Sequence, residues 1–330
     1  MLKKLWQRGC DFLGVEHALL GGAMTWVSER NLVSAISNAG GFGVLACGAM
    51  PPEILRDEII ATKKLTTKPF GVNLILMHPK LFDLIAICQQ ENIEFVVLAG
   101  GIPSQAALDA LKQTSMRIIA FAPNLLFAKK LVRMGVDALI IEGCEAGGHI
   151  GPVSTSVLAQ EILPHIYEVP VFVAGGIARG EAMIEYLRMG ASGVQLGTRF
   201  VCAHECIAHP DFKRAFIRAQ ARDASASVQL DPRFPVIPVR ALSNKATEAF
   251  QAKQREVIAR FDKGEIALKE GQLEIEHFWA GALRKAVMDG DIDNGSLMAG
   301  QSVGMVTQEQ STQSIIDELI AQGLNYLKNP

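Results

Sequence analysis

The sequence has no excess of charge of either sign and no long uncharged hydrophobic run. Its 32 lysines and arginines against 34 aspartates and glutamates give a formal net charge of -2, so nothing favours nucleic acid or an anionic membrane as a partner. Near the amino end Lys3, Lys4 and Arg8 precede an apolar stretch that Asp11 and Glu16 interrupt, which fits neither a secretory signal nor a membrane span. We therefore expect a cytoplasmic protein with a small-molecule ligand.

The cysteines form no paired framework. The chain has 6 of them, scattered without the spacing of a disulfide-bonded scaffold, so we expect reduced thiols. Two lie close to two histidines in "CAHECIAHP", residues 202–210, but this spacing matches no established zinc pattern. We therefore expect no bound metal and interpret the segment as a packed helix.

Short β-rich runs alternate with helical stretches over the first two hundred residues. A chain of 330 residues with 49% hydrophobic and 20% charged residues has the composition of a globular enzyme and is long enough for one large domain plus an appendage. Helical periodicity is clear, for example, over Asn31–Ala39, and each helical stretch ends near a glycine. The strand candidates are Ala18–Leu20, Gly43–Ala46, Phe70–Leu74, Phe95–Leu98, Arg117–Phe121, Ala138–Ile141, Val169–Val173 and Gly193–Leu196. These β-α units predict an α/β fold, a (βα)8 TIM barrel, in preference to an open doubly wound sheet with the same local pattern.

The pattern changes after Arg199. Residues 202–290 are richer in charge, are predicted to be mostly helical and contain the proline-bearing linker "LDPRFPVIPVR", Leu230–Arg240, so we predict an inserted helical cap or substrate domain. Residues 291–330 contain the glycine-rich stretch "NGSLMAGQSVGMV" and a last amphipathic helix near Ser314–Tyr326. We predict a barrel over residues 1–201 and a C-terminal segment, 291–330, that returns to it.

Two glycine-bearing loops lie where barrel enzymes commonly hold phosphate, after strands seven and eight. In "VAGGIARG", Gly175 and Gly176 let backbone N–H groups approach an oxyanion ahead of a helix N-terminus. In "GVQLGTRF", Gly197 and Thr198 add backbone donors and a hydroxyl, and Gln195 offers an amide to a ring or ribityl chain. Tight turns alone would explain one such loop, but two at these positions favour a phosphate cradle.

A histidine stands among glycines in "IEGCEAGGHIG", residues 141–151, a few residues after the sixth strand. Gly147, Gly148 and Gly151 permit a flat ligand to approach the backbone, and an imidazole exchanges protons near neutral pH. The alternative is a loop histidine that hydrogen-bonds its own backbone. Its place beside the cradle favours a catalytic role for His149.

Two more strand ends carry residues suited to a cofactor. Asn73, in "VNLILMHP", offers an amide to a cofactor edge, although it would equally cap a turn. In "LLGGAMTW", Gly22, Ala23 and Met24 are small enough for an aromatic ring to lie along the backbone. Core packing is the alternative for Met24.

The ordered set "GGAM", "AGGFGV", "PFGVN", "EGCEAGGHIG", "AGGIARG", "QLGTRF" and "AGQSVGMV" resembles the nitronate monooxygenase family, formerly called 2-nitropropane dioxygenases. The same set is shared by their close relatives, the FMN-dependent enoyl-acyl-carrier-protein reductases of bacterial fatty-acid synthesis. The resemblance covers nearly the whole chain. It implies an FMN-binding barrel with a smaller helical domain.

The resemblance also implies which residues contact FMN. Gly176, Gly197 and Thr198 would bind the phosphate, and His149 would be the catalytic residue beside the flavin. The full set of cofactor-binding residues that it implies is Gly22, Ala23, Met24, Asn73, Glu142, Ala146, Gly147, Gly148, Gly175, Gly176, Gln195, Leu196, Gly197, Thr198, Met298 and Gln301.

Two reactions are implied. In a monooxygenase, His149 would deprotonate or orient a nitroalkane-derived anion, and FMN with dioxygen would convert it to a carbonyl compound and nitrite. In a reductase, NAD(P)H would supply the electrons that FMN passes to an enoyl thioester. Glu142, where monooxygenases usually have glutamine, and the tail "GDIDNGSLMAGQSVGMV" are reductase-like, whereas "LLGGAM" and the linker depart from the reductases. We rank nitronate oxidation first, with a homodimer as the candidate assembly.

A non-flavin phosphate-binding barrel, such as a sugar-phosphate isomerase or aldolase, is the alternative from a second class. It predicts a colourless protein, usually with a lysine or paired carboxylates at the strand ends. The predicted strand ends carry asparagine, glutamine, glutamate and glycine instead, which disfavours that chemistry.

Overall fold

The computed structural model describes residues 1–48, 50–234 and 237–328, apart from the side chains of residues 276, 277, 279 and 280. Eight parallel strands form one sheet in the order β1-β9-β8-β6-β5-β4-β3-β2. The sheet closes because Leu20 bridges to Phe42 just before β2, with the Gly21 amide 2.9 Å from the Phe42 carbonyl oxygen. The strands are β1 (Leu19–Gly21), β2 (Gly43–Ala46), β3 (Phe70–Ile75), β4 (Phe95–Ala99), β5 (Arg117–Phe121), β6 (Ala138–Glu142), β8 (Val171–Ala174) and β9 (Gly193–Leu196).

This arrangement confirms the predicted (βα)8 barrel. All eight predicted strands are present, three of them, β2, β5 and β9, with the predicted boundaries. The strand predicted at Val169 begins instead at Val171, after Pro170, which has no backbone N–H to donate to a ladder. The surrounding helices are α2 (Arg30–Asn38), α3 (Pro52–Leu65), α4 (Leu81–Gln90), α5 (Gln105–Lys112), α6 (Leu125–Met134), α7 (Thr155–Ile162) and α8 (Gly180–Arg188).

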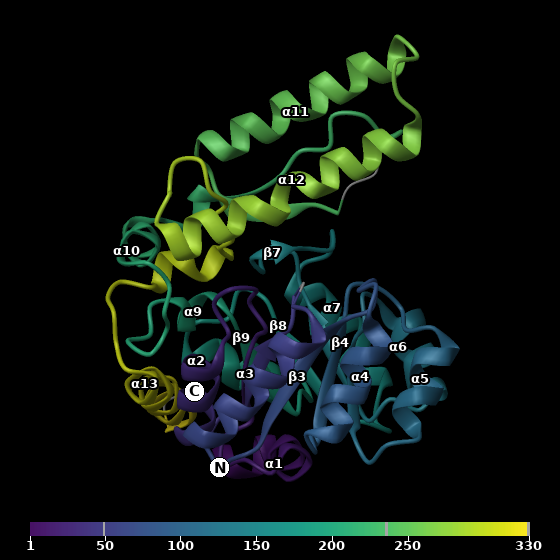
Figure 1. Cartoon of the computed structure of the whole chain (residues 1–330). Helices are drawn as coiled ribbons and strands as arrows, with labels where there is room; N and C mark the ends of the chain where they lie inside the picture. The colour runs from purple at the N-terminus through teal and green to yellow at the C-terminus, as the bar shows by residue number, and fades with distance from the viewer. Residues whose placement is uncertain (49, 235–236, 329–330) are drawn as a thin grey trace.

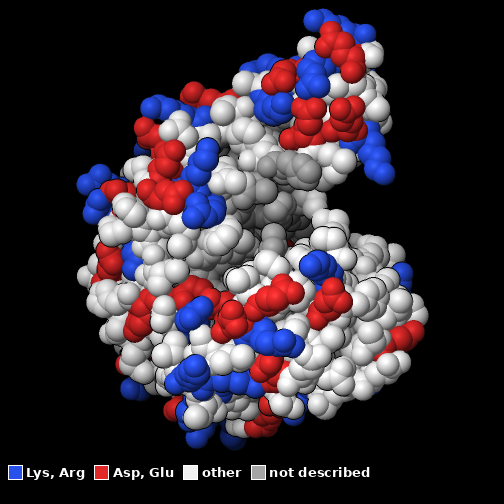
Figure 2. Space-filling view, viewed as in Figure 1, with Lys and Arg blue, Asp and Glu red and all other residues white. Residues whose placement is uncertain are grey.

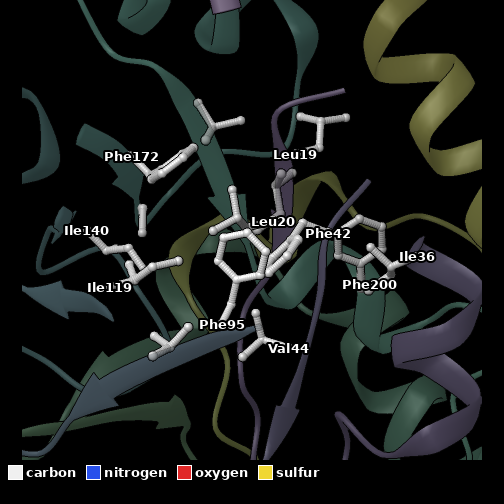
Figure 3. Packing of buried hydrophobic residues seen from close by; sticks show 14 of the residues in the cluster. Leu19, Leu20, Ile36, Phe42, Val44, Phe95, Ile119, Ile140, Phe172 and Phe200 are labelled. Carbon is white, nitrogen blue, oxygen red and sulfur yellow. The ribbon is translucent and has the colours of Figure 1, made fainter. Parts of the chain in front are cut away.

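Aromatic side chains fill the barrel interior. Phe42, Phe95 and Phe172 are fully buried, and Figure 3 shows them among aliphatic side chains from several strands. The Phe42 and Phe95 rings meet edge to face at 5.1 Å, a favoured aromatic geometry. The first helix, α1 (Leu2–Leu13), lies at the end of the barrel away from the cap (Figure 1), where Phe12 packs against Phe95 at 5.6 Å. The interior is therefore a packed core, and a ligand site belongs at the other rim.

Above that rim, within residues 202–290 predicted as a cap, α11 (Lys245–Asp262) and α12 (Leu268–Asp289) project from the barrel as a helical hairpin (Figure 1). The hairpin has its own apolar core around Phe234, Phe250 and Val257. The prediction of a mostly helical segment missed two strands, β10 (Ala224–Ala226) and β11 (Val239–Leu242). They form a second sheet with β7 (Gly148–His149) in the order β10-β11-β7.

The remaining chain links the cap to the barrel. The cap begins with α10 (Pro210–Arg218) and η2 (Ala221–Asp223); the tail contains η3 (Gln301–Met305) and α13 (Thr312–Lys328). Helix α13 packs closely on α8, since a Cβ on Gly180 would lie 2.1 Å from the Leu319 carbonyl oxygen. The short elements η1 (Leu163–His165) and α9 (Thr198–Val201) complete the barrel. Across the described ranges, no helix is both long and apolar enough to cross a membrane.

Candidate active site

The carboxyl ends of β1 and β9 bring five of the predicted cofactor residues together. The Gly22 amide donates to the Leu196 carbonyl at 2.8 Å. A Cβ built on Gly22 would lie 3.5 Å from Gln195 Nε2, and one built on Gly197 would lie 3.5 Å from Met24 Sδ. Glycine at these positions therefore keeps the backbone of the rim open to a ligand.

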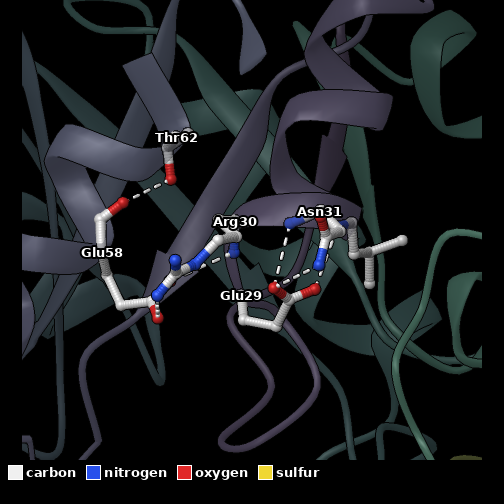
Figure 4. Close-up of polar contacts among 6 residues, drawn as sticks. Glu29, Arg30, Asn31, Glu58 and Thr62 are labelled. Atoms are coloured by element: carbon white, nitrogen blue, oxygen red, sulfur yellow. Dashed lines mark hydrogen bonds and ion pairs between the residues drawn. The ribbon is translucent and has the colours of Figure 1, made fainter. Parts of the chain in front are cut away.

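Hydrogen bonds from Ser28 hold the loop that carries Gly22 and Met24 in place. Ser28 Oγ donates to the Gly22 carbonyl at 2.7 Å and accepts from the Met24 amide at 3.0 Å. Next to it, the buried Glu29 carboxylate accepts from the amides of Asn31 and Leu32 at the start of α2 (Figure 4). Burial raises the pKa of Glu29, although these two amide bonds oppose the shift. A capped helix and an internal hydrogen bond thus fix the loop before any ligand binds.

The predicted phosphate cradle has the backbone geometry that an oxyanion requires. Gly175 and Gly176 have φ angles of +97° and +72°, which side-chain-bearing residues rarely adopt. In the described part of the chain, the amides of Gly176 and Ile177 donate to no acceptor. These two glycines and Gln301 line one cavity of about 220 Å³. Unpaired amides at a glycine turn ahead of α8 fit a phosphate.

A hydrogen bond connects Thr198 of the predicted cradle to the C-terminal tail. Its buried Oγ1 accepts a hydrogen bond from the Gly300 amide at 2.9 Å, which leaves the hydroxyl hydrogen to be donated to an anion. The tail also contacts the loop before β7, because the Gln301 amide donates to the Glu145 carbonyl at 2.9 Å. Met298 lies at the same place, with Sδ 3.6 Å from a Cβ built on Gly148. Met298 and Gln301, predicted from the far end of the sequence, therefore reach the rim.

Asn73 and Gln195 lie on β3 and β9, which β1 and β2 separate in the barrel, and they differ in their contacts. Asn73 is buried in β3, and its Nδ2 donates to the Val97 carbonyl at 3.0 Å. One N–H of the amide thus bonds the neighbouring strand, which leaves its oxygen and its second N–H to meet a cofactor edge. Gln195 is buried in β9 beside Gly22.

Glu142 ends β6, in register with Ala174 of β8. Burial raises the pKa of its carboxyl to about 7, since a low-dielectric environment disfavours the charged form. At neutral pH a large fraction of the carboxyl is protonated, and a protonated carboxyl donates a hydrogen bond that a carboxylate cannot. Glu142 is therefore suited to a ligand edge that carries an acceptor.

We expect Glu142→Gln to stabilise the flavin-free protein in a pH-dependent way. Below the unfolded pKa of 4.5 the carboxyl is protonated in both states, so the variant gains nothing. From there to about pH 7 only the unfolded state ionises, which lowers the wild-type free energy of unfolding. The variant's gain should grow over this window and level off at about 2–3 kcal/mol.

Urea unfolding of flavin-free protein at several pH values measures this gain. Glu265→Gln, at an exposed position of the cap, is the matched control and should give no pH-dependent gain. A constant difference between Glu142→Gln and wild type from pH 4 to pH 8 would contradict the raised pKa.

His149 lies in a strand and not, as predicted, in a loop. The two residues of β7 pair with β11 of the cap, where His149 is opposite Val239, and the His149 side chain is exposed. Strand β7 lies between the hairpin and the barrel (Figure 1). In Figure 2 the molecule is hollowed between these two parts. His149 thus belongs to the boundary of an open cleft, above the rim that carries the cradle.

Two contacts are not predicted from the sequence: a clamp between β6 and α7, and a contact between cap and barrel. The Glu145 carboxylate accepts from the amide and the hydroxyl of Thr155, both at 2.9 Å, which fixes the segment between β6 and α7. On the other side of the cleft, the Arg284 guanidinium of α12 lies 5.9 Å from the ring centre of Trp26. Trp26 has a φ of +68°, a strained conformation for a bulky residue. Arg284 and Trp26 are distant in sequence, so no local pattern signals their contact. Glu145 and Thr155 are 10 residues apart, and their bonds depend on how the chain between them turns.

The segment "CAHECIAHP" contributes to packing but is not the predicted helix, because α9 ends at Val201 and α10 begins only at Pro210. Cys202 and Cys206 are buried, and His209 Nδ1 accepts from the Asp211 amide at the start of α10. Among the described residues no group of three or more His, Cys, Asp or Glu side chains is arranged to hold a metal ion.

A glycine-lined anion cradle at the carboxyl end of a (βα)8 barrel, with amide and carboxyl groups beside it, defines a class of barrel enzymes that bind phosphorylated cofactors. The model of the family "Nitronate monooxygenase" matches residues 7–90 and 83–322, so the chain belongs to the nitronate monooxygenase family. It is an enzyme of the oxidoreductase type, and the family supports a flavin cofactor.

Three known proteins illustrate the similarity. The structure of FabK from Thermotoga maritima has 34% sequence identity, a TM-score of 0.87 and coverage of 97% of each chain. The (3aS,4S,5R,7aS)-5-hydroxy-7a-methyl-1-oxo-octahydro-1H-indene-4-carboxyl-CoA dehydrogenase of Mycobacterium tuberculosis is 28% identical, with 96% of each chain covered. The nitronate monooxygenase of Paraburkholderia phytofirmans is 29% identical over 71% of this chain and 76% of its own.

Proposed function

We propose that this protein is an FMN-dependent oxidoreductase that reduces an enoyl thioester with NAD(P)H, with His149 as the catalytic residue. The observation that carries the proposal is the position of the His149 strand. It lies in the cleft between the cap and a rim whose Gly176 and Ile177 amides are without acceptors in the described chain. The backbone of the cradle and the Thr198 hydroxyl would bind the FMN phosphate.

A bound FMN would supply the hydride chemistry between NAD(P)H and the β-carbon of an enoyl thioester. His149 supplies the proton that the α-carbon takes up, as a general acid within reach of the open cleft. Glu142, protonated in part at neutral pH because burial raises its pKa to about 7, donates a hydrogen bond to the edge of the ligand. Gln195 and Asn73 orient that ligand from two separate strands, β9 and β3.

Two observations support proposing the thioester ahead of the nitronate. The dehydrogenase relative has a carboxyl-CoA, which is an acyl thioester, in its name. The cleft between hairpin and barrel is open to solvent (Figure 2), as the long arm of a carrier thioester requires. Glu142 and the tail motif, both reductase-like, agree with this order.

Oxidation of an alkyl nitronate by dioxygen, to a carbonyl compound and nitrite, is the second candidate. The family assignment and the relative from Paraburkholderia phytofirmans favour it. In that reaction His149 would deprotonate or orient the substrate anion at the same place.

A visible spectrum of the purified protein, followed without oxygen, tests the proposal. We expect a yellow protein that NADH or NADPH bleaches and that a short enoyl-CoA, such as crotonyl-CoA, then re-oxidises. Bleaching by a nitronate but by neither nucleotide would move the assignment to the monooxygenase. A protein that reconstitution with FMN leaves colourless would end both assignments.

A further inference from the structure

Arg240 connects the cap to the segment that carries His149. It stands in β11 and is only 8% exposed. Its Nε donates to the Cys144 carbonyl at 2.8 Å, and its Nη1 donates to the Ala224 carbonyl of β10 at 2.5 Å. One guanidinium therefore joins the start of the β6–β7 segment to the small sheet of the cap.

The backbone around Arg240 fixes the other end of the same segment. Arg240 is opposite Gly148 in the β7–β11 ladder, and Val239 is opposite His149. The Ile150 amide then donates to the Pro238 carbonyl at 2.9 Å. The chain from Cys144 to Ile150 is thus attached to β11 at both ends, first by the Arg240 side chain and then by the ladder.

The charge of Arg240 has no carboxylate partner within 4 Å in the described chain, and its hydrogen-bond acceptors there are two carbonyl oxygens. Burying a cation without an opposite charge costs desolvation free energy. A hydrophobic side chain of similar size would destabilise the protein less at such a place. Arginine supplies two N–H groups in a rigid fork. The geometry requires such a fork, because the two carbonyls belong to different parts of the molecule.

We infer that Arg240 is the positioning residue of His149, holding the β6–β7 segment at the height above the barrel rim where the imidazole meets the substrate. This inference rests on the proposed function for its effect on turnover. Its structural part, the attachment of residues 144–150 to the cap, stands without it.

Arg240→Gln and Arg240→Lys test the inference in the flavin-loaded full chain. We expect kcat to fall by about 10² for the glutamine variant, because a displacement near 1 Å costs a rate factor of this order. The KM for NAD(P)H should stay within about twofold, since the loss concerns geometry and not binding. Lysine, which reaches only one carbonyl at a time, should restore part of kcat.

Two further measurements separate positioning from folding. Hydrogen–deuterium exchange of a peptide spanning residues 144–151 should accelerate at least tenfold in Arg240→Gln, while the barrel strands keep their protection. Arg255→Gln, an exposed arginine of α11, is the matched control and should leave both exchange and kcat unchanged.

The double variant Arg240→Gln with His149→Ala decides whether Arg240 acts through His149. We expect no further loss beyond that of His149→Ala alone, because the two residues act as a unit. An equal additional loss in the double variant would overturn the inference, as would unchanged exchange of residues 144–151. If His149→Ala itself keeps full turnover, the proposed function fails, and accelerated exchange would still support the attachment.

Discussion

His149→Ala should lower kcat by about 10²–10⁴-fold, the range that one general acid or base contributes, while the protein keeps its flavin. The imidazole is exposed at the cleft, so its loss removes no buried core contact that folding requires. The backbone of β7 stays paired with β11 through main-chain bonds, which an alanine preserves. Turnover is therefore expected to fall without a loss of fold or cofactor.

Steady-state rates, flavin content and far-UV circular dichroism are measured together on the same preparation. His165→Ala is the matched control, because His165 is also exposed but lies in η1, away from β7, and should keep wild-type turnover. His149→Gln keeps a hydrogen-bonding group without a titratable proton and should be nearly as slow as the alanine variant. Full turnover by His149→Ala with normal flavin would remove the catalytic assignment.

The barrel could be predicted because each strand carries its own local signal. An apolar run between a helical stretch and a glycine or proline identifies β5 without reference to its neighbours, and parallel strands buried on both faces need no alternating pattern. The cradle was predictable for the same reason. Gly175 and Gly176 adopt positive φ angles that glycine accepts without strain.

The second sheet was not predictable because its signal is not local. β7 has only two residues, and its partner, β11, lies about ninety positions further along the chain. The linker that contains β11 has several prolines, a composition that argues against a strand. The sequence therefore predicts a loop at His149. The hydrogen bond between Arg240 and Cys144 could not be predicted either, because no sequence pattern between the two residues indicates it.

The contact of the C-terminal tail with the barrel could be predicted only in part. The glycines of "NGSLMAGQSVGMV" suggested a return to the barrel, but which glycine makes the contact depends on packing. A Cβ built on Gly147 would lie 2.6 Å from the Gly300 nitrogen and 2.7 Å from the Ala299 carbonyl carbon. Both are backbone atoms, which cannot rotate away as a side chain can.

Gly147→Ala is the second substitution for which we expect a large effect, on both the free energy of unfolding and the affinity for flavin. The added methyl would push the β6–β7 segment from the tail, at the place where the Gln301 amide bonds Glu145 and the Gly300 amide bonds Thr198. Overpacking of this kind costs about 1–3 kcal/mol of the free energy of unfolding, and broken hydrogen bonds add to it. Because Thr198 belongs to the cradle, we also expect the Kd for FMN to rise at least tenfold.

Gly151→Ala is the matched control for Gly147→Ala. It adds the same methyl to the same segment, but a Cβ there has no neighbour within 4 Å, and neither glycine has a positive φ. The pair therefore isolates the steric effect from backbone strain. Urea unfolding and FMN titration should place Gly151→Ala within about 0.5 kcal/mol of wild type, with unchanged affinity. Equal behaviour of the two variants would show that the contact between the β6–β7 segment and the tail contributes nothing to flavin binding.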